Sequence, residues 1–237
     1  MKKEIIHNLQ VAGVILGGIL INIPLAVGYY YGNLSTYTDS YFIASVGREN
    51  HQTGLLWLPS VWISLLSVGM IFSGIMSRRI GSRLTLMIGI LVFNLGVYTS
   101  FFTIQSSLWV LHVTLGVLTG IGSGICYGMT LLYTVTWIKS RVGFVSAVVS
   151  SAFGGGSLIF NLMITYFINP QNLEPDISVG ESKYFSQDEI INRVPYVFLV
   201  IGALTTGFHI IAFPLMRNHP NLPQYSNKKK STNNTLL

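Results

Sequence analysis

The polar side chains that could do chemistry are few, and they lie within long apolar stretches of the sequence. The main ones are Asn22, Asn94, His112, Asn161 and His209. Two of these are histidines that could carry a proton, and titratable groups inside a membrane-spanning stretch are functional candidates by default. His112 lies near the end of its stretch and fits an interfacial histidine. His209 lies deeper and fits a hydrogen bond between helices as well as it fits a proton site.

These residues do not form the groups that enzymes use. Paired carboxylates, a Ser-His-Asp set and a cluster of metal ligands are missing from the apolar stretches, and no polar domain is present to hold an active site. The single cysteine, Cys126, fits a small packing residue. We therefore predict that the chain is not an enzyme and uses no metal and no cofactor.

The composition indicates a membrane protein. Half of the residues are hydrophobic and only 9% are charged, against about 25% in an ordinary soluble domain. The apolar residues come in runs of about 20, the length needed to cross a ~30 Å hydrocarbon layer. Because only helices satisfy their backbone within one such run, we predict an all-α membrane protein with six transmembrane helices. The spans are expected at 11–31, 53–76, 84–104, 108–135, 144–168 and 195–216, with an N-terminal segment at 1–10 and a lysine-rich tail at 217–237.

The Lys and Arg residues divide unequally between the two sides of this bundle. One side receives Lys2, Lys3, Arg78, Arg79, Arg83, Lys139, Arg141, Arg217, Lys228, Lys229 and Lys230, whereas the other receives Arg48, Lys183 and Arg193. The positive-inside rule places the first side, with both termini, in the cytosol. Since this bias explains the net charge of +6, we expect the lipid bilayer as a partner and no nucleic acid.

The long connection between the fifth and sixth spans carries five of the eight acidic residues. Within it, Ser186 to Glu189 is typical of a capping box, with Ser186 at the N-cap and Glu189 three residues into the helix. This pattern predicts a short helix before Pro195. We expect a structural loop, with an extracellular docking surface as the alternative.

Small residues recur at four-residue spacing in two of the spans. Gly116, Gly120, Gly124 and Gly128 in the fourth span form a groove that lets another helix approach closely. The fifth span offers Ser146, Ser150 and Gly154 on one row and Ala147, Ser151 and Gly155 on the next, so we expect these faces to pack together. The triplet Gly154, Gly155 and Gly156 also eases bending. Static packing explains any single pair, but several glycine-lined helices favour helices that slide or rock.

The stretch GIMSRRIGSRL, residues 74–84, holds three arginines within six residues. It resembles the loop signature of the major facilitator superfamily, G-x-x-x-D-R-x-G-x-R, with Gly74, Arg79, Gly81 and Arg83 in register. Arg78 stands where family members often have an acid, which implies an altered gating motif. The segments at 32–41, at 137–161 and between the last two spans are similar to the oxalate:formate antiporter-like branch, close to the monocarboxylate transporters. This similarity covers residues 10 to 216.

The resemblance implies one half of a twelve-span fold built from two six-helix halves, and the chain resembles the amino-terminal half. In such carriers the basic residues that pair with the substrate lie in the other half, and no span here contains Lys or Arg. The first and fourth spans would line the substrate path, which nominates Asn22, Tyr29, Tyr30, Tyr127 and Tyr133. A tyrosine can stack on a planar anion and donate a hydrogen bond to it. Each tyrosine also fits an interfacial belt.

The expected function is that of a secondary-transporter domain for small carboxylate anions such as oxalate, formate or other monocarboxylates, working by alternating access. It would need a second half, supplied by a homodimer or by a separate carboxy-terminal half. The alternative is a truncated or split, non-transporting membrane protein that pairs with a full-length transporter and regulates it. A self-contained channel is disfavoured, because no segment resembles a pore loop. We expect the plasma membrane rather than an internal membrane.

Overall fold

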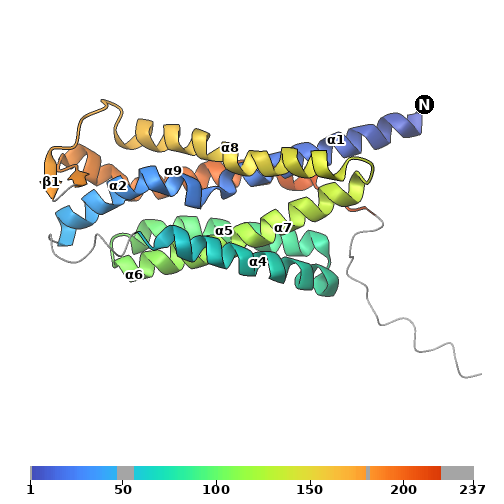
Figure 1. Cartoon of the computed structure of the whole chain (residues 1–237), viewed down its shortest axis with the longest axis horizontal. Coiled ribbons are helices and arrows are strands. Elements are labelled where there is room, and N and C mark those ends of the chain that lie inside the picture. Colours follow the sequence, from blue (N-terminus) through green and yellow to red (C-terminus); the bar gives the residue numbers. More distant parts are fainter. Residues whose placement is uncertain (1, 47–55, 180–181, 220–237) are drawn as a thin grey trace, which may run out of the picture.

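The computed structural model describes residues 2–46, 56–179 and 182–219 of the chain. Within these residues, six long apolar helical segments lie along one axis of the molecule (Figure 1). They are α1 (Lys2–Asn22) joined by the 3-10 turn η1 (Ile23–Leu25) to α2 (Val27–Val46); α4 (Leu58–Ile80); α5 (Ser82–Thr103); α6 (Leu108–Leu111) continued by the π-helical η2 (His112–Leu118) and α7 (Thr119–Trp137); α8 (Val142–Ile168); and α9 (Asp188–Ala212) with the 3-10 turn η3 (Phe213–Leu215). Two short antiparallel strands, β1 (Ile177–Val179) and β2 (Ser182–Tyr184), form a hairpin between α8 and α9.

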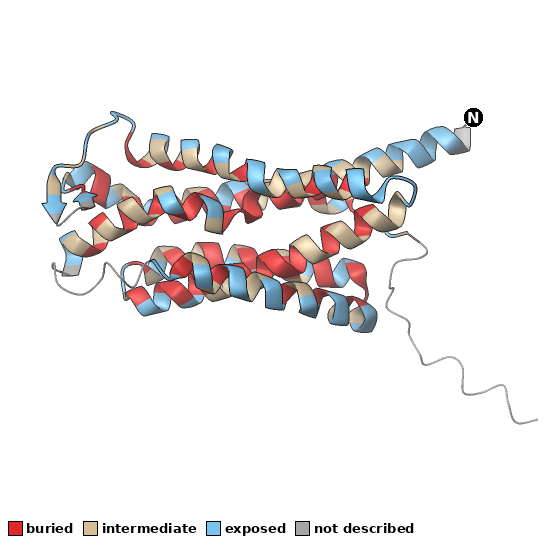
Figure 2. Ribbon diagram, in the orientation of Figure 1, coloured by how far each residue is buried: buried red, intermediate tan, exposed pale blue. Residues whose placement is uncertain are grey.

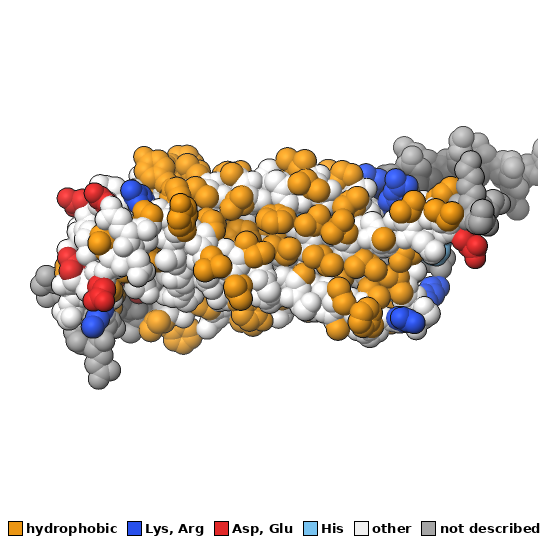
Figure 3. All heavy atoms as spheres, turned by 90° about the horizontal axis from the view of Figure 1, so that it is seen from above, with side chains coloured by type: hydrophobic (Ala, Val, Ile, Leu, Met, Phe, Trp, Pro, Cys, Tyr) orange, Lys and Arg blue, Asp and Glu red, His pale blue; other side chains and the backbone are white. Residues whose placement is uncertain are grey.

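The surface of the bundle is the kind that a bilayer covers. Apolar side chains occupy the middle of the long axis, and charged side chains gather at its two ends (Figure 3). On the face shown, most Lys and Arg lie at the end that carries the N-terminus, and most acids lie at the opposite end. Large apolar side chains such as Ile71, Leu162 and Ile210 are more than 60% exposed, which water would not favour over so wide an area.

The first and last helical segments are longer than the expected spans. The first starts at Lys2 and reaches Val46, with its α-helix interrupted at Ile23–Leu25, where Pro24 has no N–H to donate to the preceding turn. The last starts at Asp188 and continues through Pro195. A proline within a membrane helix is tolerated when neighbouring groups satisfy the freed backbone, so Pro195 does not mark the start of the span.

The capping box predicted at Ser186 is wrong. Helix α9 has Gln187 at its N-cap, without a side-chain hydrogen bond to the helix. Ser186 binds Asp176 instead: its N–H donates to Oδ1 of Asp176 at 2.8 Å, and its hydroxyl donates to Oδ2. At the N-cap the Ser186 oxygen would accept from a helix N–H, whereas here the serine donates twice to a carboxylate, and hydrogen bonds to a charged acceptor are the stronger ones.

The expected seven-residue connection between the second and third spans is almost absent. Helix α4 continues to Ile80 and α5 begins at Ser82, so Gly81 alone separates them. Gly81 has φ 90° and ψ 153°, a conformation that residues with a Cβ rarely adopt. Arg78 and Arg79 lie in the last turn of α4, where positive side chains complement the helix dipole.

Helix α7 is the central helix of the bundle. Of the 18 consecutive residues that are most apolar in its span, 67% are buried inside the structure. The corresponding share is 22% for α4 and 17% for α8 (Figure 2). The glycine row of α7 faces α4, not α8. A Cβ on Gly120 would lie 2.7 Å from the Trp62 carbonyl oxygen, and a Cβ on Gly124 would overlap the Leu66 carbonyl oxygen.

The small residues of α8 are therefore not the partner of the α7 glycine row. Gly154 and Gly155 have no atom within 4 Å of a built Cβ, whereas a Cβ on Gly156 would overlap the Ile23 carbonyl oxygen of η1. Sequence spacing marks a helix face that can be approached closely, but it does not identify which helix approaches it. In this bundle, α8 makes its close approach to η1 through one glycine of the triplet.

The connection between α8 and α9 folds onto the end of α2. Phe185 stacks on Tyr37 with ring centroids 5.2 Å apart, and its N–H donates to Oγ of Ser40 at 3.0 Å. In the hairpin, Ser178 lies opposite Lys183. This part of the chain is an ordered cap on the end of the bundle that lies opposite the N-terminus (Figure 1).

We expect this cap to loosen in acid. The hydrogen bonds from Ser186 hold the pKa of the Asp176 carboxyl below its usual range. The stabilisation is therefore complete above the unfolded pKa of about 3.9 and is lost as the pH falls through the lowered pKa of the folded state. Ser186→Ala should bring the loss to higher pH, and Ser178→Ala should not. Hydrogen exchange of residues 170–187 between about pH 2 and 5 measures this, and identical profiles for both variants would contradict it.

Candidate functional site

Four aromatic rings from four helices meet within the bundle. Trp62 of α4 stacks on Phe153 of α8, with centroids 6.0 Å apart. Tyr29 of α2 meets both rings edge-on, at 6.5 Å and 5.8 Å, and Tyr127 of α7 lies 5.1 Å from Phe153. We call Tyr29, Trp62, Tyr127 and Phe153 the aromatic cluster. Phe153 is its centre, because it contacts the other three rings.

Two glycines determine where the indole of Trp62 lies. A Cβ on Gly28 would lie 2.6 Å from the Cζ3 atom of Trp62, and a Cβ on Gly120 would crowd the Trp62 backbone. Helix α4 therefore approaches α2 on one side and α7 on the other, and the ring is only 2% exposed. The position of Trp62 depends on the absence of side chains at Gly28 and Gly120.

The aromatic cluster also carries hydrogen-bonding groups. The Tyr127 hydroxyl lies 2.9 Å from the Ser150 hydroxyl of α8. The Nε1–H of Trp62 is buried without a hydrogen-bond partner among the described residues, and Tyr29 is 59% exposed. The cluster therefore offers ring faces and an accessible phenol, which suit a small planar solute with an acceptor oxygen, whereas the Trp62 donor is enclosed in this conformation.

Asn22 lies at the junction of α1 and η1, away from any exposed surface. It is fully buried, and its amide nitrogen donates to the Gly18 carbonyl at 2.8 Å and to Oγ1 of Thr130 at 2.9 Å. Its Oδ1 has no hydrogen-bond partner in the described structure. Asn22 therefore joins α1 to α7 beside the helix interruption at Pro24.

Tyr30 and Tyr133 have no ring contact with the aromatic cluster. Tyr30 is fully buried and stacks on Phe160 with centroids 5.2 Å apart. Tyr133 donates its hydroxyl hydrogen to Oδ1 of Asn218 at 2.9 Å, at the start of the C-terminal segment. Of the five residues expected to line a substrate path, the structure brings Tyr29 and Tyr127 together, joined through Phe153.

The sequence analysis did not find Trp62 and Phe153. They lie on the second and fifth spans, and the nominated residues came from the first and fourth. Trp62 is one of four tryptophans and Phe153 one of 13 phenylalanines, so residue type alone did not distinguish them. A usable signal was present in the small neighbours, since Phe153 directly precedes the glycine triplet.

A second polar group joins α5 to α9. The Asn94 amide nitrogen lies 2.9 Å from Nδ1 of His209, and Asn94 Oδ1 accepts from Thr205 and Thr206 at 2.9 and 3.2 Å. Because an amide nitrogen can only donate, Nδ1 of His209 accepts and its hydrogen lies on Nε2. His209 thus makes a hydrogen bond between helices in its neutral form.

The residues of the predicted gating motif lie at the end of the bundle that holds most of the basic residues. Gly74, Arg78 and Arg79 are exposed on α4, and no atom lies within 4 Å of a Cβ built on Gly74. The Arg83 guanidinium carbon lies 5.2 Å from the centre of the Phe213 ring of η3, within cation–π range. Arg83 therefore links α5 to the end of the last span.

Comparison with known proteins assigns the family. Residues 11–236 match the model described as Major Facilitator Superfamily. The chain belongs to the major facilitator superfamily. It is an integral multi-pass membrane protein of a transporter family, not of an enzyme family, and its six long apolar helices agree with one of the two six-helix halves of that fold.

Two curated relatives narrow the comparison. The chain is 36% identical over 190 residues to the Escherichia coli protein described as "Uncharacterized MFS-type transporter YhjX", covering 80% of this chain and 42% of the relative. It is 25% identical over 231 residues to "Apicoplast pyruvate carrier 1" of Toxoplasma gondii, covering 79% of this chain and 42% of the relative. The chain spans about two fifths of the length of both.

Proposed function

We propose that this chain provides one half of a facilitator that moves small carboxylate anions, such as pyruvate, formate or oxalate, by alternating access. The observation that carries the proposal is the aromatic cluster, in which four helices bring Tyr29, Trp62, Tyr127 and Phe153 to one place. The similarity to a pyruvate carrier supports the substrate class. The aromatic cluster is then this half's wall of the substrate site.

The chemistry of the aromatic cluster suits part of such a site. A carboxylate and its carbon skeleton are planar and can lie against ring faces, with an oxygen placed at the positive edge of a ring or at a hydroxyl. The rings supply no positive charge, however, and an anion in a membrane needs a partner of opposite charge. We infer that the counter-charge comes from the second half of the transporter.

Helices α4 and α8 are the surfaces that we assign to the second half. They are the least buried spans, and α8 presents Gly154 and Gly155 without a neighbour within 4 Å of a built Cβ. Such bare backbone lets another helix approach closely in lipid. The second half could be a continuation of this polypeptide or a separate chain. A second copy would bring the same spans, in which Lys and Arg lie only near the helix ends, such as Arg78 and Arg79 in the last turn of α4.

The gating motif and the orientation belong to the same proposal. With both termini in the cytosol, Arg78, Arg79 and Arg83 lie at the cytosolic end, where they would face the neighbouring half. Arg83 already binds the Phe213 ring within this half. Arg78 and Arg79, which are exposed, would then contact the neighbouring half and stabilise the conformation in which the cytosolic side of the transporter is closed.

The fluorescence of Trp62 tests whether the aromatic cluster binds the substrate. Replacing Trp57, Trp109 and Trp137 by Phe leaves Trp62 as the sole tryptophan of this chain, and the tryptophans of the second half used in the assay are replaced by Phe as well. When this variant is co-reconstituted with the carboxy-terminal half of a relative, we expect saturable quenching by pyruvate, formate or oxalate and none by the uncharged amide of pyruvate. Quenching that is linear in anion concentration, or equal for the amide, would contradict the proposal.

A further inference from the structure

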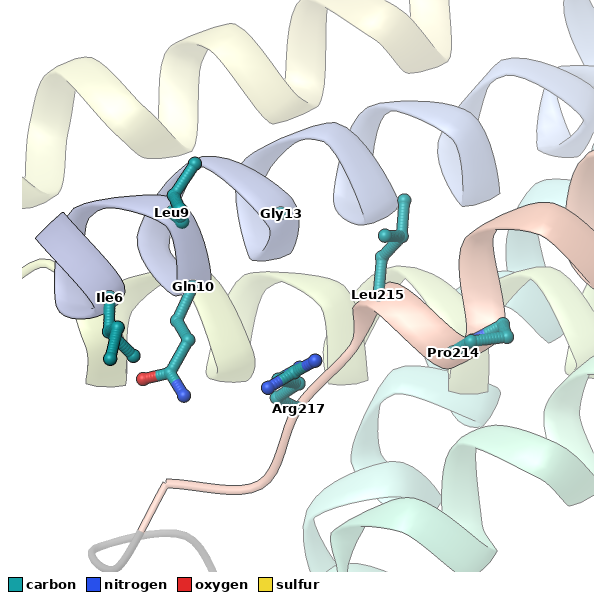
Figure 4. Close-up of a pocket in the computed structure, with 7 residues that line it drawn as sticks. All are labelled: Ile6, Leu9, Gln10, Gly13, Pro214, Leu215 and Arg217. Carbon is teal, nitrogen blue, oxygen red and sulfur yellow. The ribbon is translucent and has the colours of Figure 1, made fainter.

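A cavity of about 420 Å³ opens at the end of the bundle that carries the N-terminus, between the first turns of α1 and the segment around η3 (Figure 4). Its apolar wall is formed by Ile6, Leu9, Pro214 and Leu215, and its polar lining by Gln10 and Arg217. It shares no residue with the aromatic cluster.

Two glycines on one side of α1 explain why the cavity is there. A Cβ on Gly17 would lie 3.0 Å from Cβ of Leu215 and 3.0 Å from the sulfur of Met216, so α1 and the end of α9 touch at this level. One turn earlier, no atom lies within 4 Å of a Cβ on Gly13. The two segments therefore separate toward the N-terminus, and the missing side chain of Gly13 leaves the space unfilled.

The polar part of the cavity is made of the Gln10 amide and the Arg217 guanidinium. Gln10 reaches from α1 into the open space that Arg217 faces from the opposite side (Figure 4). The Arg217 backbone is fixed at both ends, because its N–H donates to the Leu215 carbonyl at 2.9 Å and its carbonyl accepts from Nε1 of Trp137 at 3.0 Å. Among the described residues, Arg217 is the one charged group that lines the cavity, so their contribution to its charge is positive.

The position and the lining together point to one ligand class. The cavity lies at the end of the bundle that carries the N-terminus (Figure 4), and on the face shown in Figure 3 this end holds most of the basic residues beside the apolar belt. In a membrane that is the depth at which lipid phosphates meet acyl chains. A guanidinium presents a planar fork of donors that matches a phosphate, and the apolar wall suits a hydrocarbon chain. A free phosphate ion would gain nothing from Ile6, Leu9 and Leu215.

We propose that this cavity binds an anionic phospholipid. Its phosphodiester lies against Arg217 and the Gln10 amide, and one acyl chain lies along Ile6, Leu9 and Leu215. Basic pockets between membrane helices on the cytosolic side recognise acidic head groups in this way. Such a lipid would tie the start of α1 to the end of α9. The inference needs only that the chain sits in a membrane, so it stands apart from the proposed transport.

Native mass spectrometry of the full chain in detergent tests the site with phosphatidylglycerol and phosphatidylcholine of matched chains. We expect tighter binding of phosphatidylglycerol. Arg217→Gln should weaken that binding about fivefold, the effect of one basic residue near a charged head group, and should weaken phosphatidylcholine less, because the choline cation offsets the phosphate charge that Arg217 meets. Gly13→Leu should weaken both lipids by filling the cavity without a clash.

Two controls match these variants at the same end of the bundle. Arg141 is exposed and Gly143 has nothing within 4 Å of a built Cβ, so Arg141→Gln and Gly143→Leu should bind both lipids as the unmodified chain does. Circular dichroism checks that all four variants keep their helix content. Equal affinity for the two lipids, equal loss in Arg141→Gln and Arg217→Gln, or displacement of the lipid by millimolar inorganic phosphate would each overturn the proposal.

Discussion

Gly156→Ala should destabilise the bundle by about 3 kcal/mol, whereas Gly155→Ala, one residue earlier on α8, should leave it unchanged or slightly more stable. A Cβ on Gly156 would overlap the Ile23 carbonyl oxygen and lie 2.7 Å from its carbonyl carbon. Backbone cannot rotate out of the way as a side chain can, so α8 or η1 must move. A Cβ on Gly155 meets nothing within 4 Å.

Comparing Gly156→Ala with Gly155→Ala separates the cost of the steric contact from the gain in helix propensity. Alanine favours a helix over glycine by about 1 kcal/mol, so propensity alone would make both substitutions stabilising. We expect the unfolding midpoint of Gly156→Ala to fall on the order of 10 °C in a mild detergent. Thermal unfolding followed by circular dichroism measures this. Equal midpoints for the two variants would show that α8 does not rest on η1 as the structure has it.

Phe153→Ala should have the largest effect on anion binding. Phe153 contacts Tyr29, Trp62 and Tyr127, so its removal leaves these rings without their common neighbour. We expect the affinity for the carboxylate to fall at least tenfold, about 1.4 kcal/mol, measured as quenching of Trp62 in the co-reconstituted protein. Tyr127→Phe removes only a hydroxyl that bonds Ser150, and it should weaken binding less than Phe153→Ala.

Ile210→Ala is the control for this prediction. Ile210 lies on α9, outside the surfaces assigned to the second half, and is 67% exposed, so its truncation should leave both quenching and the affinity unchanged. The unfolding midpoint of each variant shows whether a loss of binding is only a loss of fold. Unchanged affinity in Phe153→Ala would remove the aromatic cluster from the substrate site.

The sequence predicts the number of apolar helices well and their ends poorly. Runs of about 20 apolar residues identify a helix because backbone groups in lipid have no other partners. The ends depend on local chemistry that composition does not show. Ser186 had an equally local alternative in Asp176, and Gly81, by adopting φ 90°, reduces the expected seven-residue connection to a single residue.

The partners of each helix face could not be read from spacing. The row from Gly116 to Gly128 predicted a face that another helix approaches, and the structure has α4 there. Spacing within one helix carries no information about the distant segment that covers it. The same limit applies to the candidate site, because Tyr29 and Tyr127 meet only through Phe153, which no pattern in the sequence links to them.

Uptake of labelled pyruvate, formate and oxalate into proteoliposomes tests the proposed half-transporter most directly. Residues 1–237 reconstituted alone should give no uptake above protein-free liposomes, because the middle of the six spans holds no Lys or Arg to pair with the anion. Co-reconstitution with the carboxy-terminal half of a relative should produce saturable uptake that a counter-substrate stimulates and whose substrate affinity Phe153→Ala lowers at least tenfold. Saturable, counter-substrate-stimulated uptake by residues 1–237 alone would contradict the proposal.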